Sequence, residues 1–212
     1  MNKILALFTG MLLLASCGTS KDIDLPPTMG FDIPDTYTLK DTPKTITVNG
    51  EPVVLSWDTL QVWDTLKDIP LDMRADYFDK VETSSINDFK WYKLIQTVPS
   101  LDTPVCTMQT KQLEFAAGEF KDISFIVISN DTPFALQRFC SANGIENLTV
   151  FSDARTREFW IQNGFLLKDY SLLTRSIMIV DENNVIQYIE YADEVTSELD
   201  LMNALAFLKS IL

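Results

Sequence analysis

The segment around Cys106 has the residue types and the spacing that best suit a catalytic site in this chain. It reads Val-Pro-Ser-Leu-Asp-Thr-Pro-Val-Cys-Thr over residues 98–107, so Cys106 follows an apolar run and stands three residues after Thr103, where a helix is expected to begin. A thiol near the N-terminus of a helix meets the positive end of the helix dipole, which favours thiolate over thiol. The sequence contains no histidine, so no imidazole can activate this sulfur.

Cys140 is the second thiol available to such a site. The chain has three cysteines, and the third, Cys17, lies at the end of an N-terminal apolar segment. One activated thiol, one partner thiol and no metal-binding histidine together indicate redox chemistry. A structural disulfide between Cys106 and Cys140 is the alternative at this point, because disulfides persist outside the cytoplasm.

The N-terminus has the features of a targeting segment. Lys3 provides a short basic region, and residues 4–14 form an apolar run too short to span a bilayer. The run ends in Leu-Ala-Ser-Cys17, which resembles the lipobox of bacterial lipoproteins; an ordinary secretory signal with an incidental cysteine is the alternative. We therefore expect a signal peptide over residues 1–16 and a lipid on Cys17, which would anchor the domain outside the cytoplasm in the cell envelope. The residue after Cys17 is Gly18 instead of aspartate, which favours the outer membrane over the inner one.

Composition limits the domain count and the class of partner. The chain carries 17 basic and 30 acidic residues, for a formal charge of −13, which argues against nucleic acid as a partner. A hydrophobic content of 46% over 212 residues is enough for the core of one domain. Residues 17–44 are polar and contain several prolines, so we interpret them as a tether and place a single domain at residues 45–212.

Alternating strand and helix patterns must position the two cysteines. Asn49-Gly50 lies between short β-prone runs and predicts a hairpin within residues 45–55, and the spacing of Trp57 and Trp63 would place both on one face of a strand. Beyond these, the patterns predict strands at 91–98, 123–129, 148–151, 176–180 and 185–189, and helices at 107–118, 133–141, 155–163 and 198–212. This order indicates an α/β domain with a thioredoxin-like fold and an N-terminal β-hairpin.

The residues around Cys106 also resemble a known family. Pro99, Thr103 and Cys106 fit the P-x-x-x-[TS]-x-x-C pattern of peroxiredoxins, and the whole segment is most similar to that of bacterial thiol peroxidases, the atypical two-cysteine members. Arg138-Phe139-Cys140 resembles the resolving-cysteine helix of that group, and the segments from Arg157 and from Arg175 resemble its later motifs. The similarity covers roughly residues 46–212.

This resemblance implies a peroxiredoxin-type fold and reduction of hydrogen peroxide and organic hydroperoxides at Cys106. It implies that Cys140 resolves the sulfenic acid into an intramolecular disulfide, that Thr103 and Arg175 lie in the site, and that Pro99 shapes the pocket. The implied partners are a hydroperoxide substrate, an external thioredoxin-like dithiol and, as is common in the family, a second copy of the chain. No cofactor or metal is expected.

Fast peroxide reduction requires more than an ionised sulfur, because the nucleophilicity of a thiolate falls as the pKa of its thiol falls. Charge must pass from the sulfur to the departing oxygen, so fixed hydrogen-bond donors are needed along the O–O axis. The Thr103 hydroxyl, backbone N–H groups near Cys106 and the Arg175 guanidinium are the expected donors, and Thr103 also suits the N-cap of the helix. Because the two cysteines are predicted on separate helices, we expect local unwinding around both when the disulfide forms.

Two other functions remain open from the sequence. An envelope thiol–disulfide oxidoreductase would share the fold, but Gln109 stands three residues after Cys106 where a C-x-x-C motif would have its second cysteine. A non-catalytic lipoprotein binding module could keep the fold and hold Cys106 and Cys140 in a structural disulfide. Rapid loss of the Cys106 thiol on mixing with peroxide would distinguish a peroxidase from both.

Overall fold

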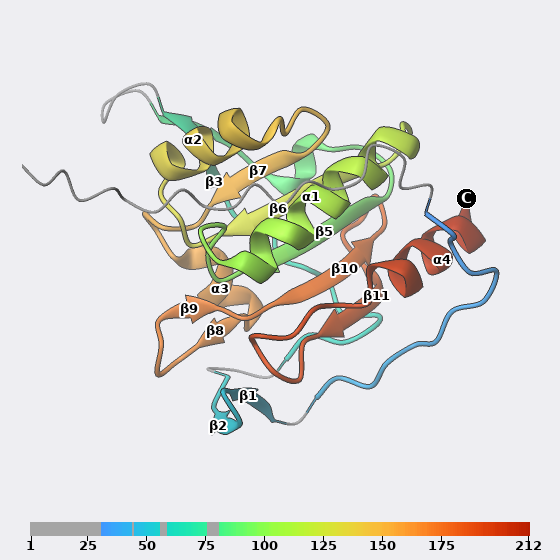
Figure 1. Ribbon diagram of the computed structural model, residues 1–212, viewed down its shortest axis with the longest axis horizontal. Coiled ribbons are helices and arrows are strands. Elements are labelled where there is room, and N and C mark those ends of the chain that lie inside the picture. Colours follow the sequence, from blue (N-terminus) through green and yellow to red (C-terminus); the bar gives the residue numbers. More distant parts are fainter. Residues whose placement is uncertain (1–30, 44, 56–58, 76–80) are drawn as a thin grey trace, which may run out of the picture.

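A computed structural model of the chain describes residues 31–43, 45–55, 59–75 and 81–212 (Figure 1). Its main sheet has seven strands in the order β11-β10-β5-β6-β7-β3-β4. The pairs β5–β6 and β6–β7 are parallel, whereas the outer pairs are antiparallel. The strands are β1 (Ile46–Val48), β2 (Glu51–Val53), β3 (Leu71–Ala75), β4 (Val81–Ser84), β5 (Lys93–Val98), β6 (Ser124–Ser129), β7 (Thr149–Ser152), β8 (Leu166–Leu167), β9 (Leu172–Leu173), β10 (Ser176–Val180) and β11 (Ile186–Tyr191). The helices are the 3₁₀ turn η1 (Ile86–Asp88), α1 (Pro104–Glu119), α2 (Pro133–Asn143), α3 (Glu158–Asn163) and α4 (Leu201–Ile211).

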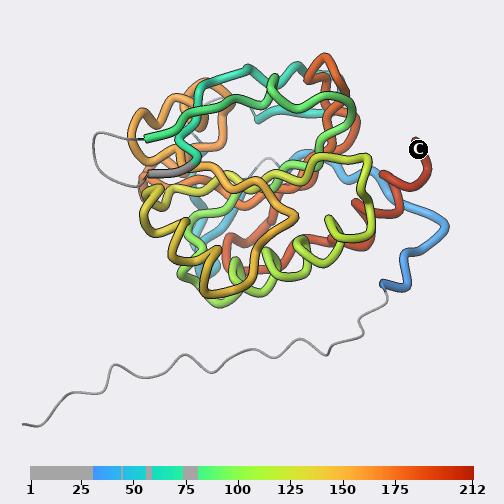
Figure 2. The backbone as a smooth tube through the Cα atoms, turned by 90° about the horizontal axis from the view of Figure 1, so that it is seen from above, coloured from blue at the N-terminus to red at the C-terminus, as the bar shows by residue number. Residues whose placement is uncertain are grey.

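The two faces of the main sheet pack against different elements. Successive side chains of a strand point to opposite faces, so Phe125 and Val127 of β6 join one apolar cluster while Ile126 and Ile128 join the other. Helices α1, α2 and α4 cover the first face, and α3 and the β1–β2 hairpin pack on the second (Figure 2). The sheet is thus buried on both sides, as its continuous β-branched strands predict.

The elements predicted from residue 91 onwards are present, with shifted ends. The helix predicted from residue 107 begins at Pro104, because proline has no N–H to satisfy and suits the first helical turn. The helix predicted from residue 155 begins at Glu158, because residues 154–156 form a turn that ends at Arg157 with a positive φ of 59°. Helix α2 runs to Asn143 and ends at Gly144, whose φ of 64° is the left-handed conformation that glycine favours.

Two expectations about the N-terminal part of the domain have different outcomes. The predicted hairpin is confirmed, with Ile46 paired to Val53 and positive φ angles at the turn residues Asn49 and Gly50. The predicted strand around Trp63 is wrong, because Trp63 lies in a turn with a φ of 77° and is 74% exposed. Trp57, its proposed partner on that strand, lies outside the described residues.

The β1–β2 hairpin is fastened to the loop of residues 192–200, which joins β11 to α4. The backbone N–H of Thr47 donates to Asp193 O over 2.8 Å, and the N–H of Val195 donates to Thr47 O over 2.9 Å. The Glu194 carboxylate accepts from the N–H groups of Asn49 and Gly50 at 3.1 and 2.9 Å. Hydrogen bonds from Gly50, and further ones from Thr47 and Thr196, lower the pKa of Glu194 to about 2.

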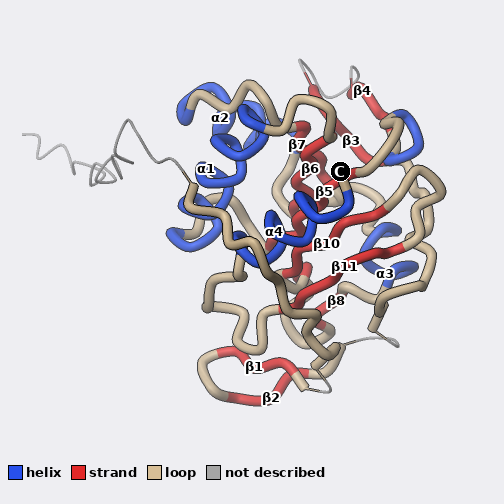
Figure 3. The backbone as a smooth tube through the Cα atoms, turned by 90° about the vertical axis from the view of Figure 1, so that its right-hand side faces the viewer, coloured by secondary structure: helices blue, strands red, loops and turns tan. Residues whose placement is uncertain are grey.

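Residues 31–43, which we call the strap, lie within the predicted tether and run beside α4 towards the hairpin (Figure 3). The Tyr37 ring packs edge-on against Phe207 of α4 with centroids 4.9 Å apart. Thr38 exchanges two hydrogen bonds with the Asn203 amide, of 2.7 and 2.8 Å. The strap therefore contacts the domain through specific side chains. Across the described segments, no helix is both long and apolar enough to cross a membrane.

Candidate active site

Cys106 is completely buried at the N-terminal end of α1. It is the third residue after Thr103, which occupies the N-cap position with extended backbone angles. The first hydrogen bond of the helix runs from the Thr107 N–H to Thr103 O over 2.9 Å. The N–H groups of Val105 and Cys106 precede it, so they have no partner within the helix and remain for other acceptors. The Cys106 side chain belongs to the apolar cluster between the sheet and the helices.

Asp131, in the connection between β6 and α2, holds the loop before α1 in place. The Asp131 carboxylate accepts hydrogen bonds from the Leu101 N–H at 2.6 Å and from the Ser100 hydroxyl at 2.8 Å. The Thr107 hydroxyl donates to Leu101 O over 2.7 Å, and Pro99 is buried directly after β5. The predicted pocket residue Pro99 therefore lies in a fixed connection between β5 and Cys106.

Thr103 lies where the sequence predicts, but its side chain does not cap the helix. Its hydroxyl donates instead to Ser100 O over 3.0 Å, and the residue is exposed. The backbone part of the N-cap prediction is confirmed and the side-chain part is wrong, because the Ser100 carbonyl lies within reach of the hydroxyl. Whether the Thr103 hydroxyl also donates to a substrate stays a prediction.

Arg175 is buried immediately before β10 and points to the same helix as Cys106. Its Nη1 group donates to Gln109 Oε1 over 3.4 Å, and its Nε group donates to the carbonyl of Val195 over 3.0 Å. Residues three apart share one face of a helix, so Gln109 brings the guanidinium to the face of α1 that carries Cys106. Among the residues that the structure describes, no carboxylate forms an ion pair with Arg175. Its charge therefore remains available to a bound oxygen.

Cys140 lies near the end of α2, half-buried against the apolar cluster that contains Cys106. Both cysteines are free thiols. Burial raises the pKa of the Cys140 thiol, and the negative charge of Glu114 raises it further. The same Glu114 carboxylate accepts hydrogen bonds from the backbone N–H groups of residues 146–148, which follow α2. Burial and the nearby Glu114 charge thus both favour the neutral thiol of Cys140.

A groove of about 370 Å³ opens beside Cys140. It lies between α2 and the strands β3 and β7, and apolar and small polar side chains contribute to its wall. Its lining residues are Met73, Leu136, Gln137, Cys140, Ser141, Ile145, Leu148, Thr149 and Val150. The resolving thiol predicted from the sequence is thus on the wall of a surface groove, whereas Cys106 is fully enclosed.

The structure brings together four of the predicted site residues and adds two that the sequence analysis missed. Pro99, Thr103 and Cys106 lie on one continuous segment, and Arg175 reaches the same helix from β10. Gln109 and Asp131 were missed as supports of Arg175 and of the loop before α1. The three-residue spacing from Cys106 could have pointed to Gln109, but nothing in the sequence around Asp131 names the loop it contacts. Cys17, the predicted lipid site, lies outside the described residues.

Comparisons with known proteins agree with this arrangement. The Redoxin family model matches residues 64–206. The thiol peroxidase of Streptococcus agalactiae serotype V is 38% identical over 152 residues, which cover 71% of this chain and 90% of that protein. The thiol peroxidase of Bacillus subtilis is 35% identical over 153 residues, which cover 72% and 89% of the two chains.

Solved structures show the same fold. A peroxiredoxin-like protein from Aquifex aeolicus superposes with a TM-score of 0.71 and 28% identity, covering 80% of this chain and 98% of that one. A thiol peroxidase from Chromobacterium violaceum superposes with a TM-score of 0.69 and 22% identity, covering 79% and 95%, and this likeness concerns the fold alone. The thioredoxin-like α/β fold predicted from the sequence is confirmed. By its family match and its identity to these relatives, the chain belongs to the redoxin family and, within it, to the thiol peroxidases.

Proposed function

We propose that the protein reduces hydrogen peroxide and organic hydroperoxides at Cys106 with electrons from an external dithiol. The observation that carries the proposal is the pairing of a buried thiol at the start of α1 with an arginine held on the same face of that helix by Gln109. The thiol peroxidase relatives support the same activity. A buried cation and free N–H groups are the donors that the departing oxygen of a peroxide requires.

The first chemical step transfers one oxygen atom to sulfur. The Cys106 thiolate attacks the terminal oxygen of the hydroperoxide, an S–O bond forms and the O–O bond breaks. The departing alkoxide or hydroxide takes up a proton and leaves as an alcohol or as water, and Cys106 remains as a sulfenic acid. Arg175 stabilises the negative charge that gathers on the two oxygens, and the N–H groups of Val105 and Cys106 contribute from the helix terminus.

The second step forms an intramolecular disulfide. The Cys140 sulfur attacks the Cys106 sulfur, the S–O bond breaks and water leaves with the Cys140 proton. Cys106 is enclosed on α1 and Cys140 lies on α2, so we expect one or both helices to unwind locally as the sulfurs meet. A thioredoxin-like dithiol then reduces the disulfide by thiol–disulfide exchange, and the groove beside Cys140 supports access to that sulfur.

Stopped-flow mixing of the reduced protein with peroxide tests the first step. We expect rapid loss of the Cys106 thiol in the wild type, followed by loss of the Cys140 thiol, and no reaction above the rate of a free cysteine in Cys106→Ser. Cys140→Ser should react once and accumulate a sulfenic acid that dimedone labels. A Cys140→Ser protein that reacts with peroxide but forms no dimedone adduct would remove Cys140 from the resolving role.

We further propose that a lipid on Cys17 anchors the domain on the outer side of a bacterial membrane. The lipobox-like sequence before Cys17 supports this, and two or more acyl chains give durable anchoring. Incorporation of labelled palmitate into the wild type, and its loss in Cys17→Ser, would be the expected result. Homodimer formation is part of the same proposal and is measured by sedimentation of the delipidated chain.

A further inference from the structure

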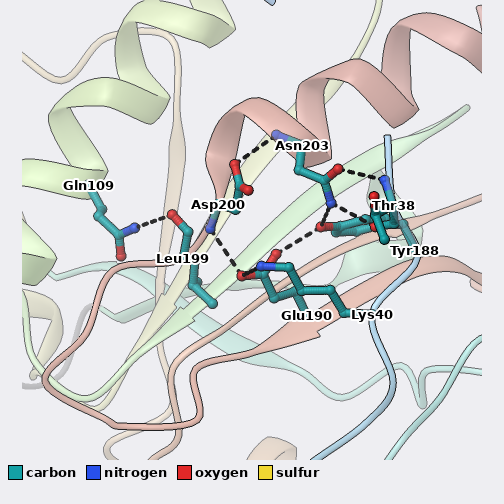
Figure 4. Close-up of polar contacts among 8 residues, drawn as sticks. All are labelled: Thr38, Lys40, Gln109, Tyr188, Glu190, Leu199, Asp200 and Asn203. Carbon is teal, nitrogen blue, oxygen red and sulfur yellow. Dashed lines mark hydrogen bonds and ion pairs between the residues drawn. The ribbon is translucent and has the colours of Figure 1, made fainter. Parts of the chain in front are cut away.

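We propose that Glu190 is a positioning residue for Arg175 and that Lys40 of the strap holds Glu190 in place. This inference rests on the proposed peroxidase function, in which Arg175 stabilises the departing oxygen. It assigns a role to the N-terminal strap, which lies outside the segment matched by the redoxin family at residues 64–206. The contacts that connect Lys40 to the arginine are shown in part in Figure 4.

Glu190 carries a charge that the fold buries almost completely. It lies on β11, with a side chain only 5% exposed. Its Oε1 atom accepts from Lys40 Nζ at 2.7 Å and from the Asp200 N–H at 3.0 Å, and its Oε2 atom accepts from the Tyr188 hydroxyl at 2.8 Å. A buried carboxylate needs such partners, because an unpaired charge is very unfavourable away from water. Lys40 supplies the positive charge, and Asp200 ties the carboxylate to the 192–200 loop.

The 192–200 loop supplies one of the groups that hold Arg175 and hydrogen-bonds to the other. Val195 O accepts directly from Arg175 Nε at 3.0 Å. Leu199 O, next to Asp200, accepts from Gln109 Nε2 at 3.1 Å, and Gln109 in turn accepts from the arginine. A shift at Asp200 therefore moves the carbonyl that orients Gln109. Figure 4 shows Glu190 below the start of α4, with Lys40 on one side and the Leu199–Gln109 contact on the other.

The hairpin and the strap hold opposite ends of this loop. Thr47 and Glu194 fasten its first part to β1, whereas the Lys40–Glu190 pair fastens its end, next to α4. Thr38 adds two hydrogen bonds to Asn203 in the first turn of α4. None of these hairpin bonds reaches Asp200 or Leu199. Asp200 is held by Glu190 and, as the N-cap of α4, by the Asn203 N–H, so the strap and α4 together hold the end of the loop that orients Gln109.

Lys40→Met in the full-length chain tests the proposal, since Lys40 is partly exposed and the variant should fold. We expect the second-order rate constant with hydrogen peroxide to fall by roughly three- to tenfold, because small displacements of a catalytic group are costly. Alkylation of Cys106 by iodoacetamide has no departing oxygen that a hydrogen-bond donor must stabilise. The rate constant for this alkylation should therefore change by less than about twofold. Loss of stability alone does not change the ratio of the peroxide rate constant to the iodoacetamide rate constant. This ratio is therefore measured over a range of pH.

Lys209→Met is the matched control, because Lys209 binds the strap at Asp35 over 3.4 Å and does not contact Glu190. Glu190→Ala should lower the peroxide rate constant by roughly tenfold or more, and Glu190→Gln by less, since its amide oxygen can still accept from the Asp200 N–H. If Lys40→Met and Glu190→Gln both keep the wild-type ratio, as Lys209→Met should, the proposal is overturned. A wild type that does not react rapidly with peroxide would instead refute the proposed function.

Discussion

At the scale of single residues, the proposed mechanism gives Arg175 the role of stabilising the departing oxygen. Within the described part of the chain, its guanidinium donates to an amide oxygen and a backbone carbonyl, neither of which neutralises its charge. A substrate oxygen that becomes negative during O–O cleavage is therefore the natural partner of the guanidinium.

We expect Arg175→Met to lower the rate constant for peroxide by a factor of roughly 10² to 10³, the usual effect of removing one such donor. Stopped-flow measurement with hydrogen peroxide checks this. Arg138→Met is the control, because Arg138 is exposed and pairs at the surface with Asp102 over 3.5 Å. An Arg175→Met enzyme that reacts as fast as the Arg138→Met enzyme would contradict the role of Arg175.

Glu114 provides a second test at this scale. Its charge adds to the effect of burial in raising the pKa of Cys140, so Glu114→Gln should move that pKa down while burial keeps it above its usual range. The pH dependence of Cys140 alkylation, measured in a chain that also carries Cys17→Ser and Cys106→Ser, gives this value. Glu119→Gln on the same helix is the control, and an equal pKa in both variants would exclude the effect of Glu114.

At the scale of elements, the start of α3 depends on a buried carboxylate. Asp153 accepts hydrogen bonds from the N–H groups of Phe159 and Trp160 at 3.3 and 2.9 Å. Burial nevertheless raises its pKa to about 6, because the hydrogen bonds compensate only in part for lost hydration. The folded state therefore binds a proton at Asp153 more strongly than the unfolded chain does.

Asp153→Asn should remove one component of the pH dependence of stability. The pKa of Asp153 is higher in the folded protein than in the unfolded chain, so the proton on Asp153 stabilises the fold. This contribution is present below about pH 4 and is lost as the pH rises through about 6. The unfolding free energy of the wild type, relative to Asp153→Asn, should thus fall by about 2 kcal/mol between pH 4 and pH 7. Urea unfolding of both proteins over this range measures the difference, and a constant difference would contradict the raised pKa.

The sequence patterns were sufficient for elements that carry their own signals. Asn49-Gly50 marked the hairpin, and the β-branched run of residues 123–129 marked β6, because these features act locally. Strands β3 and β4 were missed, although the residues of β3, Leu-Asp-Met-Arg-Ala, alternate between apolar and polar types. β3 lies between the edge strand β4 and β7, and its pairing with β7 joins segments far apart in the chain, which depends on tertiary contacts.

The same distinction applies to the site. Cys106, Thr103 and Pro99 share one segment whose spacing is visible in the sequence. Gln109 and Asp131 act on groups that only the fold brings to them, and the support of Arg175 by the 192–200 loop requires the positions of β11, α4 and the hairpin together.

At the scale of the whole molecule, the proposed disulfide would form across a well-packed face of the sheet. Cys106 and Cys140 belong to helices that cover the same apolar cluster, so we expect a bond between them to displace side chains of both helices. We expect peroxide to increase hydrogen exchange at residues 101–108 and 137–143 while the central strands β5 and β6 keep their protection. Cys140→Ser should show no such increase, and an unchanged exchange pattern in the oxidised wild type would contradict the required unwinding.

The mass of the reduced, folded protein after one equivalent of hydrogen peroxide is the most direct test of peroxide reduction at Cys106. We expect the loss of two hydrogen atoms, a peptide pair that joins Cys106 to Cys140, and full reversal by dithiothreitol. Peptides in which Cys106 remains a thiol after this treatment, or a protein already joined at these cysteines that no dithiol reduces in the folded state, would contradict it.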